Sequence, residues 1–313
     1  MEFLVEEKAN GKIYEISELV TKVSYTDKLN DGCSKLEFSY IDDDLYIENG
    51  SLISFKYDNT GIFYGVVFKV GRGKGKEINV TAYDQLRYCK AKDTFSTKGE
   101  TVTSLASKMC MNFGILKGSL ADTKYKLATN TYNDQSWLDI LYSAISETLQ
   151  NTGRKYCIRD EFGSIAIRDI EDLKINLILG DESLVYDYNY SKSIDDDFYN
   201  LIKIKDKKSA DPIEEKDIKS INKYGLLQHF ETANEKMNTS QIKAMAKVLL
   251  KLYNQEKESL SLNCLGDTRI RAGTGFMAMI EDIIGRNMMR WFIVKSVTHD
   301  FIPIHTMSLE VTL

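Results

Sequence analysis

Residues 81–95 read Thr-Ala-Tyr-Asp-Gln-Leu-Arg-Tyr-Cys-Lys-Ala-Lys-Asp-Thr-Phe, and they stand where the pattern of apolar residues changes its period. Before this stretch, apolar and polar residues alternate in short runs, which is the pattern of half-buried strands. After it, apolar residues recur every three or four positions, which is the pattern of one helix face. The stretch therefore predicts a junction that closes a strand-rich N-terminal segment and opens a helical one.

Residues 12–83 are predicted to form a succession of short strands. Turn residues separate the runs at 49–50, 58–61 and 71–76. Many short antiparallel strands at close spacing favour a small barrel or sandwich. The apolar residues that alternate with polar ones are Leu36, Phe38, Tyr40, Ile53, Phe55, Tyr57, Ile78, Val80 and Ala82.

The segment after the junction predicts two helices followed by a hairpin. Gly114 is suited to a C-cap after the first apolar stripe, and Asn133 or Asp134 is a good N-cap before the second. The combination predicts a small α+β domain in the middle of the chain. The expected bounds are Thr101 to Gly114 for the first helix, Asn133 or Asp134 to just before Gly153 for the second, and 155–159 with 164–170 for the hairpin.

Strand character returns in the C-terminal part of the sequence. Residues 206–219 are strongly charged and predict a mobile loop or hairpin tip, whereas residues 239–256 predict a helix with one apolar face. Residues 291–313 are similar, as a pair of strands, to residues 62–83, which hints at two similar barrels. The alternating apolar residues here are Tyr186, Tyr188, Tyr190, Ile202, Ile204, Leu260, Leu262, Cys264, Met307, Leu309, Val311 and Leu313.

Composition favours a folded protein of two or three domains. The chain has 313 residues, of which 43% are hydrophobic and 28% charged. Its net charge of −5, with 9 Arg against 32 Lys, argues against specific nucleic-acid binding, which needs a basic surface and the rigid fork of Arg. The sequence carries neither an export signal nor an apolar run long enough for membrane insertion.

The five cysteines are odd in number and widely spaced. This usage indicates reduced thiols in a cytosolic folding compartment, and we expect at least four of them to be buried. No Gly-x-Ser-x-Gly elbow occurs, and no cysteine has a recognisable His or Asn context, so no catalytic nucleophile is predicted.

The histidines and carboxylates give no metal or cofactor site. His299 and His305 flank a turn and are expected to face one another across a hairpin, but zinc needs three or four ligands, and no Cys or carboxylate pair lies near them at ligand spacing. The aspartate runs at 42–44 and 195–197 lack the spacing of a calcium loop and are expected to be solvated. With 46 acidic residues, chance carboxylate pairs of the glycosidase kind are certain, so this alternative stays open. Met277, Met279, Met288 and Met289 are expected in a core or a subunit interface.

The glycine-rich run Gly71-Arg-Gly-Lys-Gly-Lys76 is the candidate contact site for a partner. A phosphate-binding loop would need Ser or Thr after its Gly-Lys and a helix after that, whereas Glu77 and a strand follow here. We therefore interpret the run as a hairpin tip. Its three cations, Arg72, Lys74 and Lys76, could meet an acidic partner.

Four stretches of the chain resemble the baseplate hub proteins of contractile phage tails and phage-like particles, the XkdQ-type and late-control-D-type proteins. The likeness keeps the family's order and spans most of the chain, although its motifs mark strands and turns rather than chemistry. The stretches are 82–88 with 92–95, then 137–149 leading into 153–160 and 163–169, then 195–204, and finally 266–273 with 291–299 and 305–313.

The resemblance implies an α+β, mainly β fold. Two small antiparallel β-barrel tube domains, 1–98 and 179–313, would enclose an inserted α+β domain at 99–178, and the second barrel would carry the charged loop 206–219 and the helix 239–256. A homotrimer would then present six barrels. Such a ring acts as a symmetry adaptor that joins a hexameric tail tube to a trimeric spike.

The same resemblance implies partners and a location. The partners would be other copies of the chain, the tail tube protein, the central spike protein and other baseplate or wedge proteins. The location would be the tail baseplate of a virion, a defective prophage particle or a tail-like bacteriocin, assembled in the cytoplasm of the bacterial host. No enzymatic activity is expected. The alternatives are a cell-wall (peptidoglycan) hydrolase that uses a carboxylate pair and a carbohydrate-binding tail adhesin that uses exposed tyrosines.

Overall fold

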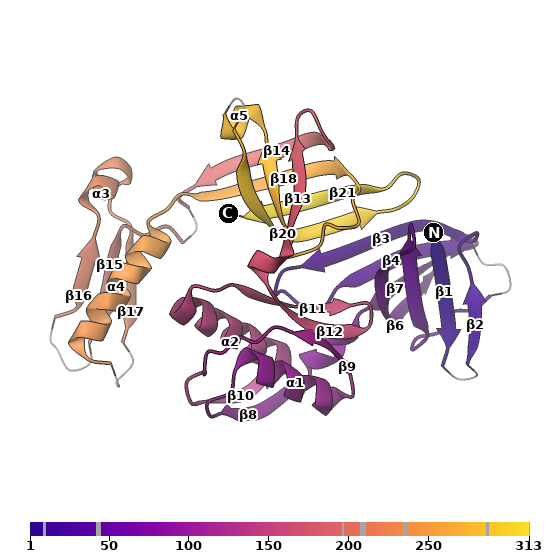
Figure 1. The fold of residues 1–313 in the computed structure, drawn as a ribbon, viewed down its shortest axis with the longest axis horizontal. Coiled ribbons are helices and arrows are strands. Elements are labelled where there is room, and N and C mark those ends of the chain that lie inside the picture. The colour runs from indigo at the N-terminus through magenta and orange to yellow at the C-terminus, as the bar shows by residue number, and fades with distance from the viewer. Residues whose placement is uncertain are drawn as a thin grey trace. The chain divides into compact units, whose positions relative to one another are not determined.

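Strands predominate in the fold, which is α+β and mainly β, as predicted (Figure 1). The structure is a computed structural model that describes residues 1–8, 11–41, 45–195, 197–206, 211–233, 237–285 and 288–312. The chain divides into two compact units. The first consists of residues 1–189 and 261–313, and the second consists of residues 190–260.

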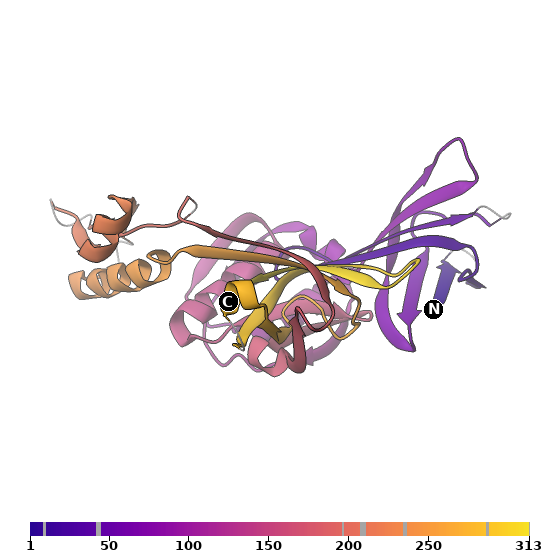
Figure 2. The same ribbon diagram turned by 90° about the horizontal axis from the view of Figure 1, so that it is seen from above.

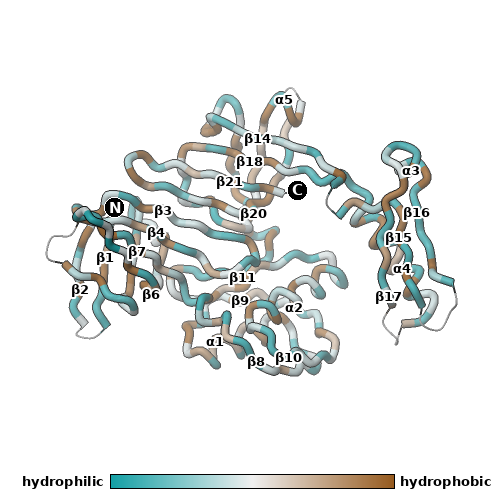
Figure 3. The backbone as a smooth tube through the Cα atoms, turned by 180° about the vertical axis from the view of Figure 1, so that it is seen from behind, coloured by the Kyte–Doolittle hydropathy of each residue, from teal (hydrophilic) through white to brown (hydrophobic). Residues whose placement is uncertain are grey.

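Seven N-terminal strands form one half of a 13-stranded sheet, in the order β3-β4-β7-β6-β5-β1-β2. Alternate side chains are buried, as period two requires, and Figure 3 shows the corresponding change between hydrophilic and hydrophobic residues along the strands. The aromatic core of this half includes Phe3, Phe38 and Phe55. The strands are β1 (Glu2–Glu7), β2 (Lys12–Glu15), β3 (Val20–Lys28), β4 (Lys35–Ile41), β5 (Leu52–Tyr57), β6 (Thr60–Arg72) and β7 (Glu77–Tyr83).

Gly65 on β6 allows a close approach that no other residue would permit. A Cβ atom at this position would lie 2.3 Å from the carbonyl oxygen of Tyr83 and 2.5 Å from the ring of Phe63. We expect Gly65→Ala to lower the free energy of unfolding by about 1–3 kcal/mol, because the strands must separate to admit the methyl group. Urea unfolding measures the change.

Gly73 at the tip of the same hairpin provides the matched control. A Cβ atom there would meet no atom within 4 Å, so Gly73→Ala should change stability by no more than about 0.5 kcal/mol. Equal effects of the two substitutions would contradict the packing that we describe for Gly65.

The junction at 81–95 turns the chain from the sheet into the middle region. It contains the 3-10 helix η1 (Gln85–Lys90) and the strand β8 (Lys92–Thr97). Two helices and four further strands follow and enclose their own core, which contains Leu105, Leu141 and Ile167. These elements are α1 (Val102–Phe113), β9 (Leu116–Leu120), β10 (Asn130–Ser136), α2 (Trp137–Thr152), β11 (Tyr156–Glu161) and β12 (Ser164–Asp169).

The helix ends in this region confirm the cap predicted at Gly114 and the end predicted before Gly153, and one helix start differs. Gly114 and Gly153 adopt the left-handed conformation after α1 and α2. The second helix starts at Trp137 rather than near Asn133, because residues 130–136 pair with β8 and the hydroxyl of Ser136 accepts the hydrogen bond that caps the helix. The predicted hairpin is confirmed as β11 and β12.

The C-terminal strands form the other half of the large sheet. β14, β18, β21 and β20 follow one another in it, and β13 pairs with β19, which pairs with β20. The elements of this part are the 3-10 helix η2 (Ile170–Leu173), β13 (Lys174–Gly180), β14 (Val185–Ser193), β18 (Lys257–Leu265), β19 (Gly275–Met279), α5 (Glu281–Ile284), β20 (Arg290–Asp300) and β21 (Thr306–Thr312).

One strand joins the two halves of the sheet. The first part of β20 pairs with β19, and its second part pairs antiparallel with β3, from Ser296 opposite Lys28 to Asp300 opposite Ser24. The yellow C-terminal strands consequently run beside the indigo strand β3 (Figures 1 and 2). The strand pairs predicted at 62–83 and 291–313 are both present, as β6 with β7 and β20 with β21.

The second unit packs one helix on a three-stranded sheet. Helix α4 covers Ile202 and Ile204 of the central strand with Ile242 and Ala246. The predicted helix 239–256 is confirmed, and it ends at Tyr253 because Asn254 caps it. The unit contains β15 (Leu201–Lys205), β16 (Ile213–Lys216), α3 (Ile218–Tyr224), β17 (Gln228–Thr232) and α4 (Thr239–Tyr253).

The charged stretch 206–219 is more ordered than the sequence suggested. Its described part contains strand β16, which pairs with β15, and the start of helix α3. A hairpin, which the sequence offered as the alternative to a mobile loop, is present: β15 and β16 pair antiparallel, and their charged side chains find cross-strand partners. The ion pair of Lys203 with Glu214, 2.8 Å apart, is one such partnership.

Candidate functional site

Four segments that are far apart in the sequence bring charged side chains together inside the first unit. Asp27 lies on β3, Asp84 precedes η1, Asp160 lies on β11, and Arg271 lies between β18 and β19. The exposed fractions of the three aspartates are 5%, 2% and 4%. Because buried charges persist only when they are paired or hydrogen-bonded, these residues are the first candidates for a function. We call them the buried charge cluster.

Arg271 connects three parts of the first unit through this cluster. Its Nε donates to Oδ2 of Asp27 at 3.0 Å, and its Nη1 donates to the backbone carbonyl of Asp160 at 2.8 Å. Its guanidinium carbon also lies 5.8 Å from the ring centroid of Tyr25. A single side chain thereby ties the C-terminal half of the sheet to the N-terminal half and to the middle region.

Asp84 fixes the junction that the sequence singled out. Its carboxylate accepts hydrogen bonds from the backbone N–H of Ser34 at 2.8 Å, from the hydroxyl of Ser34 at 2.6 Å, and from the N–H of Leu86 at 2.9 Å. Burial raises the pKa of Asp84, and the nearby charge of Asp160 raises it further; burial likewise raises the pKa of Asp160. The carboxylate of Asp84 thus caps η1 and also holds Ser34, the residue that precedes β4.

His299 and His305 face one another, as predicted from their positions around the turn. Nε2 of His299 donates to the carbonyl of Ile270 at 2.9 Å, so its Nδ1 accepts from Nε2 of His305 at 3.0 Å. The pKa of His299 is lowered to about 4, chiefly by burial and also by the neighbouring His305, and burial lowers the pKa of His305 as well. Both imidazoles are therefore neutral at pH 7 and serve as hydrogen-bonding parts of the core.

The space beside these groups is too small for a substrate. A cavity of about 20 Å³ lies among Tyr25, Ile270, Arg271 and His299, which is room for a single water molecule. Asp27, Asp84, Arg271 and both histidines hydrogen-bond to neighbours within the fold, whereas the hydroxyl of Tyr25 and Oδ2 of Asp160 are buried without a hydrogen-bond partner among the described residues. The arrangement holds the sheet halves and the middle region together.

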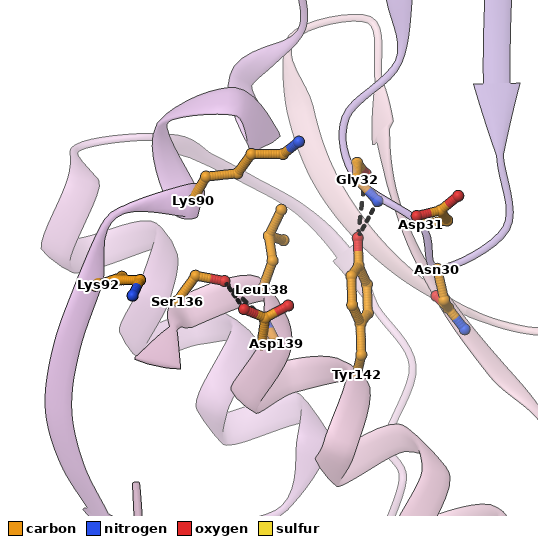
Figure 4. A pocket seen from close by; sticks show the side chains of 9 residues that line it. All are labelled: Asn30, Asp31, Gly32, Lys90, Lys92, Ser136, Leu138, Asp139 and Tyr142. Atoms are coloured by element: carbon orange, nitrogen blue, oxygen red, sulfur yellow. Dashed lines mark hydrogen bonds between the residues drawn. The ribbon is translucent and has the colours of Figure 1, made fainter. Parts of the chain in front are cut away.

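An open pocket with a volume of about 390 Å³ lies between η1 and the start of α2 (Figure 4). The hydroxyl of Tyr142 accepts from the N–H of Gly32 at 2.9 Å and donates to its carbonyl at 3.1 Å. Asp139 accepts a hydrogen bond from the hydroxyl of Ser136, and both belong to the start of helix α2. The pocket residues are Asn30, Asp31, Gly32, Lys90, Lys92, Ser136, Leu138, Asp139 and Tyr142.

The acidic groups of this pocket have structural partners. Asp31 pairs with Lys28 at 3.4 Å, and Asp139 stabilises the helix start that Ser136 caps. Lys92 pairs with Asp134 at 3.1 Å. At this pocket, Tyr142 thus joins the β3–β4 turn to the middle region.

The predicted contact residues Arg72, Lys74 and Lys76 lie at the tip of the β6–β7 hairpin. All three are exposed, and the guanidinium of Arg72 lies 5.2 Å from the ring centroid of Tyr46. Their role in binding a partner stays a prediction.

The remaining candidates have diverse surroundings. Four cysteines are buried and Cys33 is half-buried, all as free thiols, which confirms the prediction. Met277 and Met279 are half-buried on β19, whereas Met288 and Met289 are 60% and 52% exposed. The run 42–44 lies outside the described residues, and Asp197 pairs with Lys257 at 3.1 Å.

Neither a metal-binding group nor a membrane span emerges from the described residues. Among them, no three His, Cys, Asp or Glu side chains gather as they would around a metal ion. None of the described helices combines the length and the apolar character needed to cross a bilayer.

The buried charge cluster was not predicted from the sequence because its members are far apart along the chain. Arg271 and Asp27 are 244 positions apart. Arg271, Asp84 and Asp160 lie in stretches that carry the family resemblance, but those stretches mark strands and turns and do not indicate which side chains meet. The sequence offered one signal for this cluster. Arginine is scarce in the chain, yet Arg269 and Arg271 both fall within the glycine-bounded run 266–273.

The fold and sequence together place the chain in a known class. A sequence model of the YqbQ-like family matches residues 23–312, and the chain therefore belongs to the YqbQ-like family. This confirms the resemblance to XkdQ-type proteins. The chain is 27% identical over 273 residues to the uncharacterized protein YqbQ of Bacillus subtilis strain 168, with 85% of this chain and 82% of YqbQ covered.

Two further comparisons agree with this membership. The chain is 27% identical over 271 residues to the phage-like element PBSX protein XkdQ of the same strain, with 85% of this chain and 82% of XkdQ covered. The solved 43 kDa tail protein of prophage MuSo2 from Shewanella oneidensis has the same fold, with a TM-score of 0.72 at 14% identity over all of this chain and 98% of that protein.

Proposed function

We propose that the chain is a structural baseplate hub of a contractile phage tail or tail-like particle. Membership of a family that includes a protein of a phage-like element supports this function, as does the fold shared with a prophage tail protein. The hub is a homotrimer that adapts the hexameric tail tube to the trimeric spike. It is built into the baseplate after synthesis in the host cytoplasm.

The open edge of the large sheet is the observation that supports the assembly of several copies of the chain. β14 stands at one end of the strand order and has a single neighbour, β18, among the described strands. Its nine residues are mostly exposed, with Tyr186 at 62%. A long strand with an open edge is a template for pairing with another chain. We infer that the trimer covers this edge.

The two sheet halves correspond to the two proposed tube domains. Residues 1–98 form the first, residues 179–313 the second, and residues 99–178 the inserted α+β domain. The halves each contain a hairpin of the same design, β6–β7 and β20–β21, which supports a repeated barrel unit. Arg72, Lys74 and Lys76 at the β6–β7 tip would contact an acidic neighbour in the tube, the spike or the baseplate wedge.

A structural role also suits the chemistry of the interior. The buried charge cluster and the histidine pair are engaged in hydrogen bonds between segments of the fold. We propose that the protein has no enzymatic activity. A purified preparation that released peptidoglycan fragments would instead favour the wall hydrolase.

We expect the purified protein to assemble to about three times its 35.7 kDa mass as its concentration rises. Multi-angle light scattering over a concentration series measures the mass. The physical reason is that an edge of this length leaves backbone hydrogen-bonding groups without partners until another copy covers it. A mass that stays at 35.7 kDa at every concentration, with and without purified spike protein, would contradict the trimeric hub.

A further inference from the structure

Helix α4 carries a second ordered face on the side away from its core. Ile242 and Ala246 are buried, whereas Val248 and Leu252 are 62% and 60% exposed. Ala244 is exposed one turn before Val248, so three apolar residues recur at every fourth position and form a stripe on the surface.

A basic stripe runs directly beside the apolar one. Lys243, Lys247 and Lys251 recur with the same spacing, one position ahead of Ala244, Val248 and Leu252. The helix holds no acidic residue between Thr239 and Tyr253, so it carries three positive charges on one side. Within the described part of the chain, none of the three lysines forms an ion pair. We call these six residues the α4 outer face.

The first unit carries a surface of the opposite charge. Asp181 and Glu182 follow β13, and Glu281 and Asp282 open helix α5. The backbone N–H of Glu281 donates to Oδ2 of Asp181 at 3.0 Å, which holds the two acidic segments side by side. All four residues are exposed.

Apolar side chains lie close to these acids along the chain. Met288, Met289 and Trp291 are 60%, 52% and 42% exposed. Large apolar side chains that gather on an exposed surface mark a site of interaction. We call these three residues, together with Asp181, Glu182, Glu281 and Asp282, the α5 corner.

We propose that the α4 outer face of one copy docks on the α5 corner of a second copy. The lysines of the first surface would meet the carboxylates of the second, and Val248 and Leu252 would pack against the exposed methionines and tryptophan. Two identical α4 faces would oppose lysine to lysine, which is unfavourable. The contact therefore joins two different surfaces, and such a contact repeated around an axis forms a ring when the rotation between neighbouring copies closes.

This inference rests on the proposed homotrimer, for which it names an interface. Neither surface includes a residue of the β14 edge, although Asp282 of the α5 corner accepts a hydrogen bond from the hydroxyl of Tyr188 on that strand at 2.8 Å. Oppositely charged rims of an interface raise the association rate and select the partner, and they lose this effect as salt screens them.

The test is a charge swap read as the assembly mass by light scattering. We expect K243E/K247E/K251E to raise the concentration for half-assembly on the order of 100-fold, because acidic side chains then face the acidic corner. E182K/E281K/D282K should have the same effect. The six substitutions combined in one chain should restore assembly, since the charges are again opposite.

The matched control is K117E/K124E/K126E, which makes the same change of net charge at exposed lysines of the middle region. It should leave assembly unchanged. Far-UV circular dichroism of each variant checks that its secondary structure is retained.

The outcomes separate this inference from the proposed function. If the unaltered chain assembles and the swaps leave its mass unchanged, the interface is refuted while the trimeric hub stands; the α4 outer face would then serve another protein. Loss of assembly in both single-surface variants without recovery in the combined chain also overturns the pairing. If the unaltered chain never assembles, the trimer itself fails, and this interface fails with it.

Discussion

Replacement of Arg271 by Met should lower the free energy of unfolding by about 3–5 kcal/mol. The substitution keeps most of the side-chain volume but leaves the carboxylate of Asp27 buried without its cation, and removing one partner of a buried ion pair has a cost of this size. It also removes the donor to the carbonyl of Asp160. Urea unfolding followed by tryptophan fluorescence measures the loss, because Trp137 is 5% exposed within the same unit.

Arg269→Met is the matched control for this prediction. Arg269 lies two positions before Arg271 and pairs with Asp267, but the side chain of Arg269 is 58% exposed. Surface ion pairs contribute at most about 1 kcal/mol to stability. In the double variant Asp27→Asn with Arg271→Met, part of the lost stability should return, since no unpaired charge then remains. Equal losses for Arg269→Met and Arg271→Met would contradict the assigned role of the buried pair.

Acidification should destabilise the fold through His299. The folded state keeps this imidazole neutral down to about pH 4, whereas an unfolded chain takes up the proton near the ordinary pKa of 6.5. Between pH 6.5 and pH 4 the unfolded state therefore binds more protons, and stability falls with falling pH by about 3 kcal/mol in total. Above pH 6.5 both states are neutral, and the contribution of His299 is constant.

His299→Gln isolates this contribution. A glutamine amide can still donate to the carbonyl of Ile270, but it does not titrate. The buried aspartates act in the opposite direction, because the raised pKa of Asp84 or Asp160 makes stability fall as pH rises above the ordinary aspartate range. The informative quantity is thus the difference in unfolding free energy between the unaltered chain and the variant, measured from pH 4 to pH 8. A difference that does not depend on pH would refute the role of His299.

The strands and helix ends that the sequence predicted are those with a local cause. Leu36, Phe38 and Tyr40 alternate with polar residues because one face of β4 is buried, and the pattern alone identifies the strand. Gly114 and Gly153 end helices because a left-handed residue is required there. The positions of His299 and His305 around a turn likewise indicated their contact.

The features that the sequence did not reveal depend on pairing across long distances. β8 and β10 are mostly polar strands that are paired with one another, and the side chains that they bury fully or partly, such as Tyr132 and Phe95, are too few to predict a strand. The parallel pairing of β9 with β12 has no sequence signature of its own. The outer face of α4 is present in the sequence as lysines at every fourth position. It was not predicted, because the apolar stripe on the core side of the helix is the stronger signal.

The pairing of β3 with β20 also constrains the order in which the protein can fold. Thr26 and Thr298, whose hydroxyls lie 3.2 Å apart across this pair, are separated by 272 positions, so the edge of β3 stays bare until nearly all of the chain has left the ribosome. Contacts of such high contact order form slowly, and a nascent chain with an uncovered strand is prone to aggregate. A truncated chain that lacks β20 would therefore expose the unpaired edge of β3 and aggregate. Subunits able to assemble would form only when synthesis has reached β20.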